Sequence, residues 1–147
     1  LVPVAPIDIQ QRCLNWTKLP NRQSPVWFEH CQGMEEREAD SPSWMNKREA
    51  NRVIEICADV VKDLHIDPSS IGVITPYLKQ REKIRGHLHH RKVHGIEPTL
   101  EGLRHGTVES FQGSECDVIV ISAVRSRPAY LKDDLKYHLG FVAQPNR

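Results

Sequence analysis

Signatures of several enzyme and binding classes are missing from this 147-residue chain. It has no G-x-x-x-x-G-K-[ST] loop and no G-x-G-x-x-G turn, so neither common glycine loop for phosphates is present. The serine-hydrolase elbow G-x-S-x-G is also absent. The four cysteines form no C-x-x-C pair, and their spacing fits neither a zinc module nor a dense disulfide scaffold. We therefore expect reduced thiols, as in an intracellular protein.

Long apolar runs and an excess of one charge are missing too. No apolar run approaches the roughly 20 residues of a membrane-spanning helix. The first six residues lack the basic and apolar regions of a signal peptide. The formal net charge is +1, so any nucleic-acid binding must depend on local patches. Length and composition are those of one soluble globular domain.

Two amphipathic helices are predicted. The first has Asn46 as its N-cap, with Glu49 three residues later in a capping-box pattern. The second is expected to follow Thr75, as its cap, and to run from Pro76 to about residue 90. The side chains expected to be buried are Ala50, Val53, Ile54, Cys57, Val60, Val61 and Leu64 in the first helix, and Tyr77, Ile84, Leu88 and the stem of Arg81 in the second.

Short segments predict strands at residues 26–30, 71–75, 104–108 and 117–124, with a further strand or turn at 139–142. The unbroken apolar run at 118–121 predicts a central strand that is buried on both faces. Residues 1–25 predict an extended lead-in segment, and residues 31–45 a charged loop. Strands that alternate with helices predict an α/β fold with a parallel sheet flanked by helices.

In such a sheet, ligands bind at the carboxyl ends of the strands. Residues 109–115 follow one strand and carry Ser110, Gln112, Gly113 and Glu115. Glycine lets a backbone approach a ligand closely, glutamine and serine donate to phosphate, and glutamate accepts from ribose hydroxyls. The alternative is a plain polar connection with a turn glycine. The composition of the segment leaves both interpretations open.

Two other segments fall at the same kind of position. Residues 75–77 begin a helix, whose N–H groups can hold an anion such as an RNA phosphate, or simply start the helix. Residues 122–127 bring Arg125 and Arg127, which either contact phosphate or lie at a solvated strand end. The histidines between 87 and 94 lie among basic residues and favour a solvated basic surface over a metal site.

Three segments carry a resemblance to a known family. They are IGVITPYLKQ at 71–80, VESFQGSE at 108–115 and VIVISAVRS at 118–126. In order and spacing they resemble motif IV, motif V and the following strand of the up-frameshift-type superfamily 1B helicases. Residues 139–141 and 145–147 look like the approach to motif VI. The residues around Trp16, Trp44 and Glu49 are most similar to the Armitage-like RNA-silencing branch, and the resemblance covers roughly residues 14–147.

The resemblance implies a domain organisation. Residues 26–147 would form the second RecA-like domain of a helicase, without its own phosphate loop and truncated before motif VI, and residues 1–25 would lead into it. In this family ATP lies in the cleft between two RecA-like domains, and RNA crosses both. ATP and Mg²⁺ would therefore be cofactors of the full-length enzyme, with their main ligands outside this chain.

The family's site residues carry over by position. The nucleotide-binding candidates are Gln112, Gly113, Glu115 and Arg125, and the RNA-binding candidates are Thr75, Pro76, Tyr77, Ser110 and Ser122. Glu115 is expected to contact the nucleotide through its ribose. No catalytic residue and no metal ligand is expected within the chain, so the chain alone is expected to be inactive.

The resemblance thus implies an ATP-dependent RNA helicase, an ATP hydrolase that acts on single-stranded RNA or an RNA duplex. Two alternatives remain: a DNA helicase or helicase-nuclease of the same family, and a non-catalytic RNA- or protein-binding module. The implied partners are the first RecA-like domain of the same protein and proteins of RNA silencing or mRNA decay. The implied location is the cytoplasm, with no membrane partner.

Overall fold

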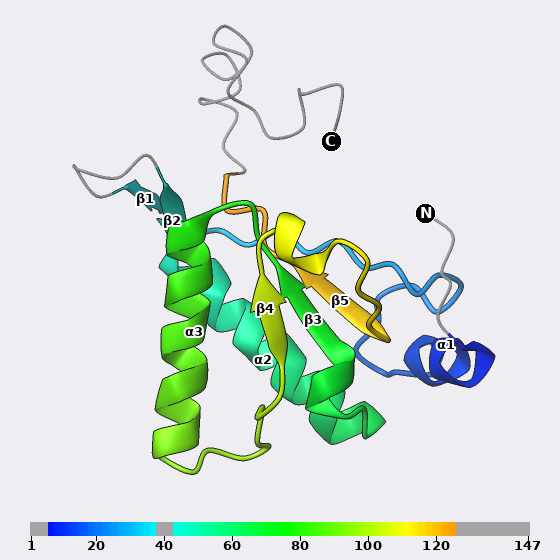
Figure 1. Cartoon of the computed structure of the whole chain (residues 1–147). Coiled ribbons are helices and arrows are strands. Elements are labelled where there is room, and N and C mark those ends of the chain that lie inside the picture. Colours follow the sequence, from blue (N-terminus) through cyan, green and yellow to red (C-terminus); the bar gives the residue numbers. More distant parts are fainter. Residues whose placement is uncertain (1–5, 38–42, 126–147) are drawn as a thin grey trace, which may run out of the picture.

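A computed structural model describes residues 6–37 and 43–125 of the chain (Figure 1). The helices are α1 (Ile7–Leu14), α2 (Lys47–Leu64) and α3 (Leu78–Val93), with short 3-10 turns η1 (Pro68–Ser70) and η2 (Glu109–Phe111). The strands are β1 (Glu35–Arg37), β2 (Trp44–Asn46), β3 (Ile71–Ile74), β4 (Arg104–Gly106) and β5 (Val118–Ile121). The strand expected at residues 139–142 and the candidate Arg127 lie outside the described residues.

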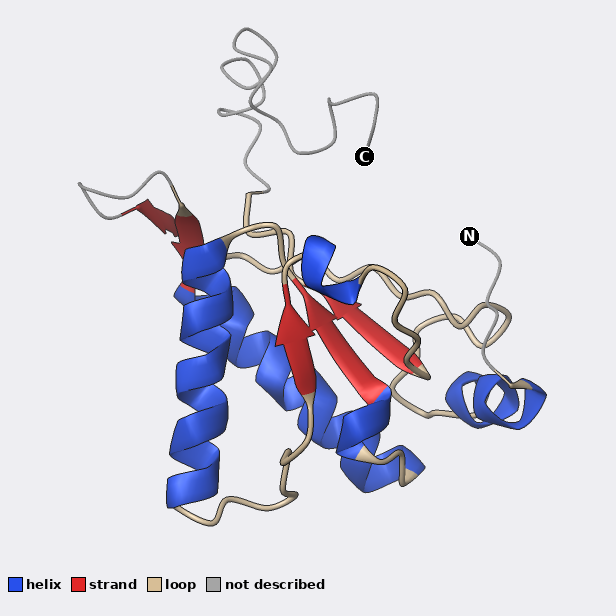
Figure 2. Ribbon diagram, viewed as in Figure 1, coloured by secondary structure: helices blue, strands red, loops and turns tan. Residues whose placement is uncertain are grey.

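The described part is built on a three-stranded parallel sheet in the order β4-β3-β5 (Figure 2). Helix α3 makes the crossover from β3 to β4, as parallel neighbours require. Ile71 and Val73 of β3 are fully buried in the core cluster that α2 and α3 share, and Val118 and Val120 of β5 pack against that cluster. The predicted α/β fold, a parallel sheet flanked by helices, is confirmed.

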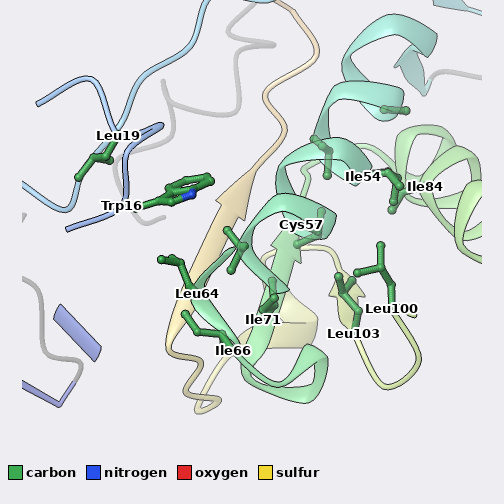
Figure 3. Close-up of a cluster of buried hydrophobic side chains, with 14 residues drawn as sticks. Trp16, Leu19, Ile54, Cys57, Leu64, Ile66, Ile71, Ile84, Leu100 and Leu103 are labelled. Carbon is green, nitrogen blue, oxygen red and sulfur yellow. The ribbon is translucent and has the colours of Figure 1, made fainter. Parts of the chain in front are cut away.

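The core lies between the sheet and α2 (Figure 3). The apolar stripe predicted for α2 is confirmed, because all of its members are buried except Val61, which is half-buried. Ile84 of α3 is fully buried against this stripe, whereas Tyr77, Arg81 and Leu88 are half-buried. The thiol of Cys57 lies inside the stripe, where burial raises its pKa to about 12. None of the four cysteines forms a disulfide.

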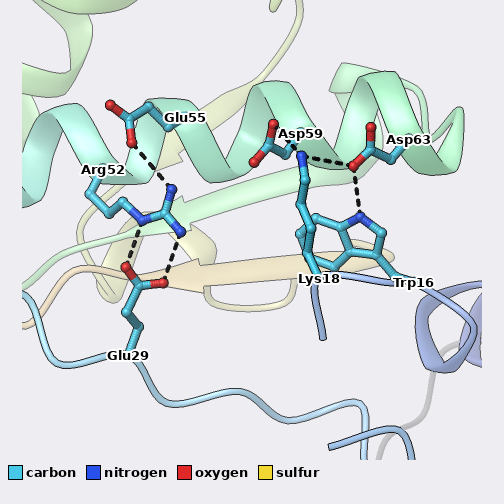
Figure 4. Close-up of polar contacts among 7 residues, drawn as sticks. All are labelled: Trp16, Lys18, Glu29, Arg52, Glu55, Asp59 and Asp63. Atoms are coloured by element: carbon cyan, nitrogen blue, oxygen red, sulfur yellow. Dashed lines mark hydrogen bonds and ion pairs between the residues drawn. The ribbon is translucent and has the colours of Figure 1, made fainter. Parts of the chain in front are cut away.

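The lead-in segment is not extended throughout: Ile7–Leu14 forms helix α1, so that expectation is wrong there. The segment after α1 lies along α2 (Figure 4). The buried Trp16 donates from Nε1 to Asp63 at 2.9 Å, and Lys18 Nζ lies 2.8 Å from Asp59 and 2.9 Å from Asp63. These contacts hold the segment against the core. Turn preferences of single residues carry no information about such tertiary contacts. The domain boundary at residue 26 stays a prediction.

The strand expected at residues 26–30 does not form. Trp27 instead packs edge-on against Trp16, with ring centroids 6.0 Å apart, and Phe28 is 89% exposed. Glu29 accepts two hydrogen bonds from Arg52 of α2, at 2.6 and 3.0 Å (Figure 4). Aromatic and β-branched residues favour a strand, but a strand also needs a neighbouring strand that pairs with its backbone. Here the segment packs against α2 through its side chains instead.

The expected loop at 31–45 contains the antiparallel pair β1–β2, so that expectation is wrong for Glu35–Arg37 and for Trp44 and Met45. Asn46 caps α2 as predicted, because its side chain accepts from Glu49 N at 3.1 Å. The capping box is incomplete, since Asn46 N donates to Gln80 Oε1 at 2.8 Å and not to Glu49. The reciprocal half of the pattern is thus replaced by a side chain of α3.

Helix α3 begins at Leu78 with Tyr77 as N-cap, two residues later than predicted, and ends at Val93. The delay has a simple cause: Thr75 N still donates to Gly106 O at 3.0 Å, so the ladder between β3 and β4 continues into the expected cap. Residues 75–77 therefore form an extended corner between strand and helix.

Strand β5 is not buried on both faces within the described residues. Its exposure alternates, with Val118 and Val120 facing the core and Ile119 and Ile121 exposed by 42% and 69%. In the described part of the chain β5 is an edge strand. The apolar run alone could not show this, because burial of the second face depends on which other elements cover it.

Candidate functional site

The carboxyl ends of all three parallel strands meet at one edge of the sheet (Figure 1). Two backbone hydrogen bonds join them just beyond the strands: Thr75 N donates to Gly106 O at 3.0 Å, and Ser122 N donates to Ile74 O at 2.8 Å. The three segments singled out in the sequence, at 75–77, 109–115 and 122–127, each leave from this edge. The segment at 109–115 then runs back toward the amino ends of the strands, because Asp117 N donates to Ser70 O just before β3 at 2.9 Å.

Phe111 anchors the 109–115 segment to the open face of the sheet. Its ring occupies the space above two glycines of neighbouring strands: a Cβ on Gly72 would lie 2.6 Å from Phe111 Cε1, and one on Gly106 would lie 3.3 Å from Cε2. The guanidinium of Arg104 stands 5.4 Å from the ring centroid. Glycine inside a strand often marks a close approach by another group, and this signal could have identified Gly72 and Gly106 from the sequence.

The polar residues around this anchor face solvent. Gln112, Gly113 and Glu115 are exposed, as is Ser110, whose hydroxyl donates to Thr107 O at 2.7 Å. Gly113 has a φ of +73°, a left-handed conformation that favours glycine, and no atom lies within 4 Å of a Cβ built there. The backbone oxygen of Glu115 accepts from Arg104 Nη1 at 3.3 Å.

Two of the RNA-binding candidates are buried. Thr75 is 1% exposed, and Ser122 is fully buried with a hydroxyl that donates to Glu49 Oε1 at 2.7 Å. Pro76 and Tyr77 are half-buried. The structure therefore brings Tyr77, Pro76 and Ser110 to the surface of this edge but not the side chains of Thr75 and Ser122. Their contact with RNA stays a prediction.

A network of buried polar groups holds together the segments at the carboxyl edge of the sheet. It was not predicted from the sequence. Gln80 Nε2 donates to Ser122 Oγ at 2.9 Å and to Asn46 O at 3.2 Å, while Gln80 Oε1 accepts from Asn46 N. Glu49 Oε1 accepts from Ser122 and also from Val124 N at 3.0 Å. Val124 is fully buried at a φ of 67°, which is unfavourable for a β-branched residue. Packing and the Glu49 bond offset that strain.

Arg125 leaves the network and turns toward β2. Its guanidinium lies 4.9 Å from the ring centroid of Trp44, and that of Arg37 lies 5.4 Å from the same ring. Cations over an indole ring are attracted by its electron-rich face. The expected cleft-edge arginine is therefore half-buried against the β1–β2 hairpin, close to the other strand ends.

The described residues hold no group of three or more histidine, cysteine or acidic side chains arranged to bind a metal ion. Within the same residues, no helix has the length and apolar character needed to cross a membrane.

Comparison with known proteins gives consistent results. The model of a family described as an AAA domain matches residues 5–147. RNA helicase Mov10l1 of Homo sapiens is 43% identical over 136 residues, which cover 91% of this chain and 11% of that protein. Regulator of nonsense transcripts 1 of Caenorhabditis elegans is 33% identical over 133 residues, 90% of this chain and 11% of that protein. Probable RNA helicase armi of Drosophila melanogaster is 38% identical over 103 residues, 70% and 8% respectively.

The chain belongs to the up-frameshift-type superfamily 1B helicases. The resemblance drawn from the three sequence segments is thereby confirmed, including its closeness to the Armitage-like branch. In this helicase domain, the IGVITPYLKQ segment is β3 with the corner into α3, the VESFQGSE segment is the η2 loop, and VIVISAVRS begins with β5. The chain spans about a tenth of the length of the curated relatives it matches.

Proposed function

We propose that this chain is part of an ATP-dependent RNA helicase, where it forms one face of the ATP cleft and part of the track for single-stranded RNA. The observation that carries the proposal is the edge of the sheet itself. The loop that leaves this edge carries the exposed residues Gln112, Gly113 and Glu115, and Phe111 anchors it to the open face of the sheet. The half-buried residues Pro76 and Tyr77 leave from the same edge. Ligands of parallel sheets bind at such edges.

The residues of the loop fit a nucleotide. The Glu115 carboxylate would accept hydrogen bonds from ribose hydroxyls, and the Gln112 side chain would donate to a phosphate oxygen. Gly113 would let the backbone come close to the ligand, because nothing lies where its side chain would be. ATP with Mg²⁺ supplies the phosphoryl group to be hydrolysed, and the first RecA-like domain would supply the main phosphate ligands. Arg125 would organise the border of the cleft.

RNA would be held through its backbone at the same edge, by Tyr77, Pro76 and Ser110. Closure of the two RecA-like domains on the nucleotide would then change the affinity for RNA, so that nucleotide binding and hydrolysis control the contact with RNA. We also propose a cytoplasmic location and partners in RNA silencing or mRNA decay; similarity to the Armitage-like branch supports both.

The nucleotide role of Glu115 predicts a selective defect. In the full-length enzyme, Glu115→Ala should raise the KM for ATP about tenfold, since a hydrogen bond to a charged group contributes roughly 1.5–3 kcal/mol. RNA affinity without nucleotide should stay unchanged. The matched control is Glu55→Ala, an exposed glutamate of α2, which should alter neither value. Steady-state ATPase assays and fluorescence anisotropy with labelled RNA measure both. Equal loss of nucleotide use and RNA binding, in a folded variant, would rule out the assigned role.

The 147-residue chain by itself should hydrolyse no ATP, because it carries no phosphate-binding glycine loop. An arginine finger alone is worth about 10³ to 10⁵ in the rate of related phosphoryl transfers, and the resemblance places that arginine outside the chain. RNA-stimulated phosphate release from the isolated chain would contradict this expectation.

Strand-displacement assays with RNA and DNA duplexes test the substrate. The full-length protein should unwind RNA duplexes in an ATP-dependent manner. Preferential unwinding of DNA would instead indicate a DNA helicase or helicase-nuclease. RNA binding without any ATP hydrolysis would indicate a non-catalytic module.

A further inference from the structure

Helix α3 carries far more positive charge than the chain as a whole. It holds six lysines and arginines against one carboxylate, Glu82, whereas the net charge of the whole chain is only +1. Three of its basic residues, Arg81, Arg85 and His89, are spaced four residues apart. Residues at this spacing lie on one side of a helix. We call these three residues the basic stripe.

The basic stripe is not neutralised by its surroundings. Neither Arg81 nor Arg85 forms an ion pair with any residue in the described ranges 6–37 and 43–125. Glu82, the one carboxylate of the helix, pairs with Lys79 at 3.6 Å instead. Cations four residues apart repel each other and destabilise a helix. A surface that lowers stability in this way fits a role in binding an anion.

Two histidines beside these cations have a lowered pKa, so the positive charge of this surface comes from arginine and lysine. His105 of β4 is half-buried near Arg81 and Arg85; burial and then those two charges hold its pKa below the usual value. Burial and the neighbouring Lys83 and His90 lower the pKa of His87 in the same direction. A pocket of about 540 Å³ beside the C-terminal half of α3 is lined by basic residues, among them Arg85 and His89, and by the two carboxylates Glu97 and Glu101.

The position of the stripe relates it to the candidate site. Helix α3 starts at the corner at 75–77 and runs back antiparallel to the strands (Figure 1). The stripe therefore begins one turn below the edge where RNA is proposed to cross. From Arg81 to His89 it extends about 12 Å along the helix.

We propose that the basic stripe is a second RNA contact, which binds the phosphate backbone of single-stranded RNA where the strand passes beyond the carboxyl edge of the sheet. This inference rests on the proposed RNA helicase function and extends its RNA track down the side of the domain. The contact is to the backbone and carries no sequence preference.

The basic stripe ends near the carboxylate of Glu101, which pairs with a basic residue one turn further along the helix. Lys92, one turn after His89, is paired with Glu101 Oε1 at 2.6 Å, and both side chains are exposed by 65%. Lys92 is therefore already engaged and contributes little to an RNA contact. Removing the charge of Glu101 should release Lys92 and lengthen the stripe by one cation.

The test uses the full-length protein without nucleotide and a labelled oligouridine. For Arg81→Gln/Arg85→Gln, the slope of log K against log salt should fall by about 1.4, because each phosphate contact on a single strand contributes about 0.7. The control, Arg22→Gln/Lys62→Gln, removes the same charge from exposed residues outside the stripe and should leave the slope unchanged. Glu101→Gln should steepen the slope by about 0.7. A gain of this kind cannot result from misfolding.

Each outcome decides between the possibilities. An unchanged slope in the Arg81/Arg85 double variant, with RNA-stimulated ATPase intact in the unmodified protein, would overturn the stripe contact and leave the proposed function standing. An equal decrease of the slope in the double variant and in its control would show that overall charge causes the effect, and would overturn the proposal. A normal slope together with loss of binding to an acidic peptide would show a protein-binding surface instead. Absence of RNA-stimulated ATPase in the unmodified protein would count against the proposed function itself.

Discussion

Replacing Gln80 with leucine should lower the free energy of unfolding of this chain by about 3 kcal/mol. Gln80 is fully buried and makes three hydrogen bonds, two to the backbone of Asn46 and one to Ser122. Leucine fills a similar volume, so packing changes little. The loss comes from Asn46 N–H, which would stay buried without an acceptor at a cost of about 1–3 kcal/mol, and from the other two bonds at about 1 kcal/mol each.

Chemical denaturation followed by circular dichroism measures this loss. The matched control is Gln11→Leu, an exposed glutamine of α1, which should change the stability by no more than about 0.5 kcal/mol. The same stability for Gln80→Leu and the unmodified chain would show that the network does not hold the edge together.

Gly72→Ala should lower the ATPase activity of the full-length enzyme by between about tenfold and about a hundredfold, because small misplacements of catalytic geometry have effects of this size. The added Cβ would lie 2.6 Å from Phe111 Cε1 and 2.8 Å from Ile119 Cδ1. The ring of Phe111 would have to move away from Gly72 and displace the 109–115 loop with it. Overpacking of this kind also costs about 1–3 kcal/mol in stability.

A second substitution distinguishes displacement of the 109–115 loop from a general loss of stability. Phe111→Leu removes the atom that the new methyl group would meet, so Gly72→Ala/Phe111→Leu should recover part of the activity lost in Gly72→Ala. Gly86→Ala serves as control, because no atom lies within 4 Å of a Cβ there. A double variant as inactive as Gly72→Ala would show that Phe111 does not transmit the effect.

The sequence predicted those parts of the fold that depend on local patterns. Helix α2 has both an N-cap and an apolar stripe, and β3 and β5 are short apolar segments between turn residues. That the candidate segments begin at one edge followed from the rule for parallel sheets, which needs only strand order along the chain. The nucleotide roles of Gln112 and Glu115 stay predictions. The loop carries Glu115 back toward the amino ends of the strands, since Asp117 N donates to Ser70 O just before β3.

What the sequence did not predict depends on partners that are distant along the chain. Glu49 looked like the end of a capping box, yet its carboxylate binds Ser122 and Val124. Ser122 looked like a strand-end hydroxyl that faces a ligand, yet it is buried because Gln80 and Glu49 both reach it. The residues around Trp27 favoured a strand, but contacts with Trp16 and α2 decided otherwise. Pattern and propensity carry no information about such choices.

The network beneath the edge has a consequence for the order in which this domain folds. Its hydrogen bonds join residues that are 34, 42, 73 and 75 positions apart. Closing such long loops is entropically costly and slow, so these bonds form only after the sheet and both helices have come together. The segment around Arg125 therefore acquires its conformation at a late step. During synthesis, the carboxyl edge of the sheet would be completed only when residue 124 has emerged, long after α2 is able to form.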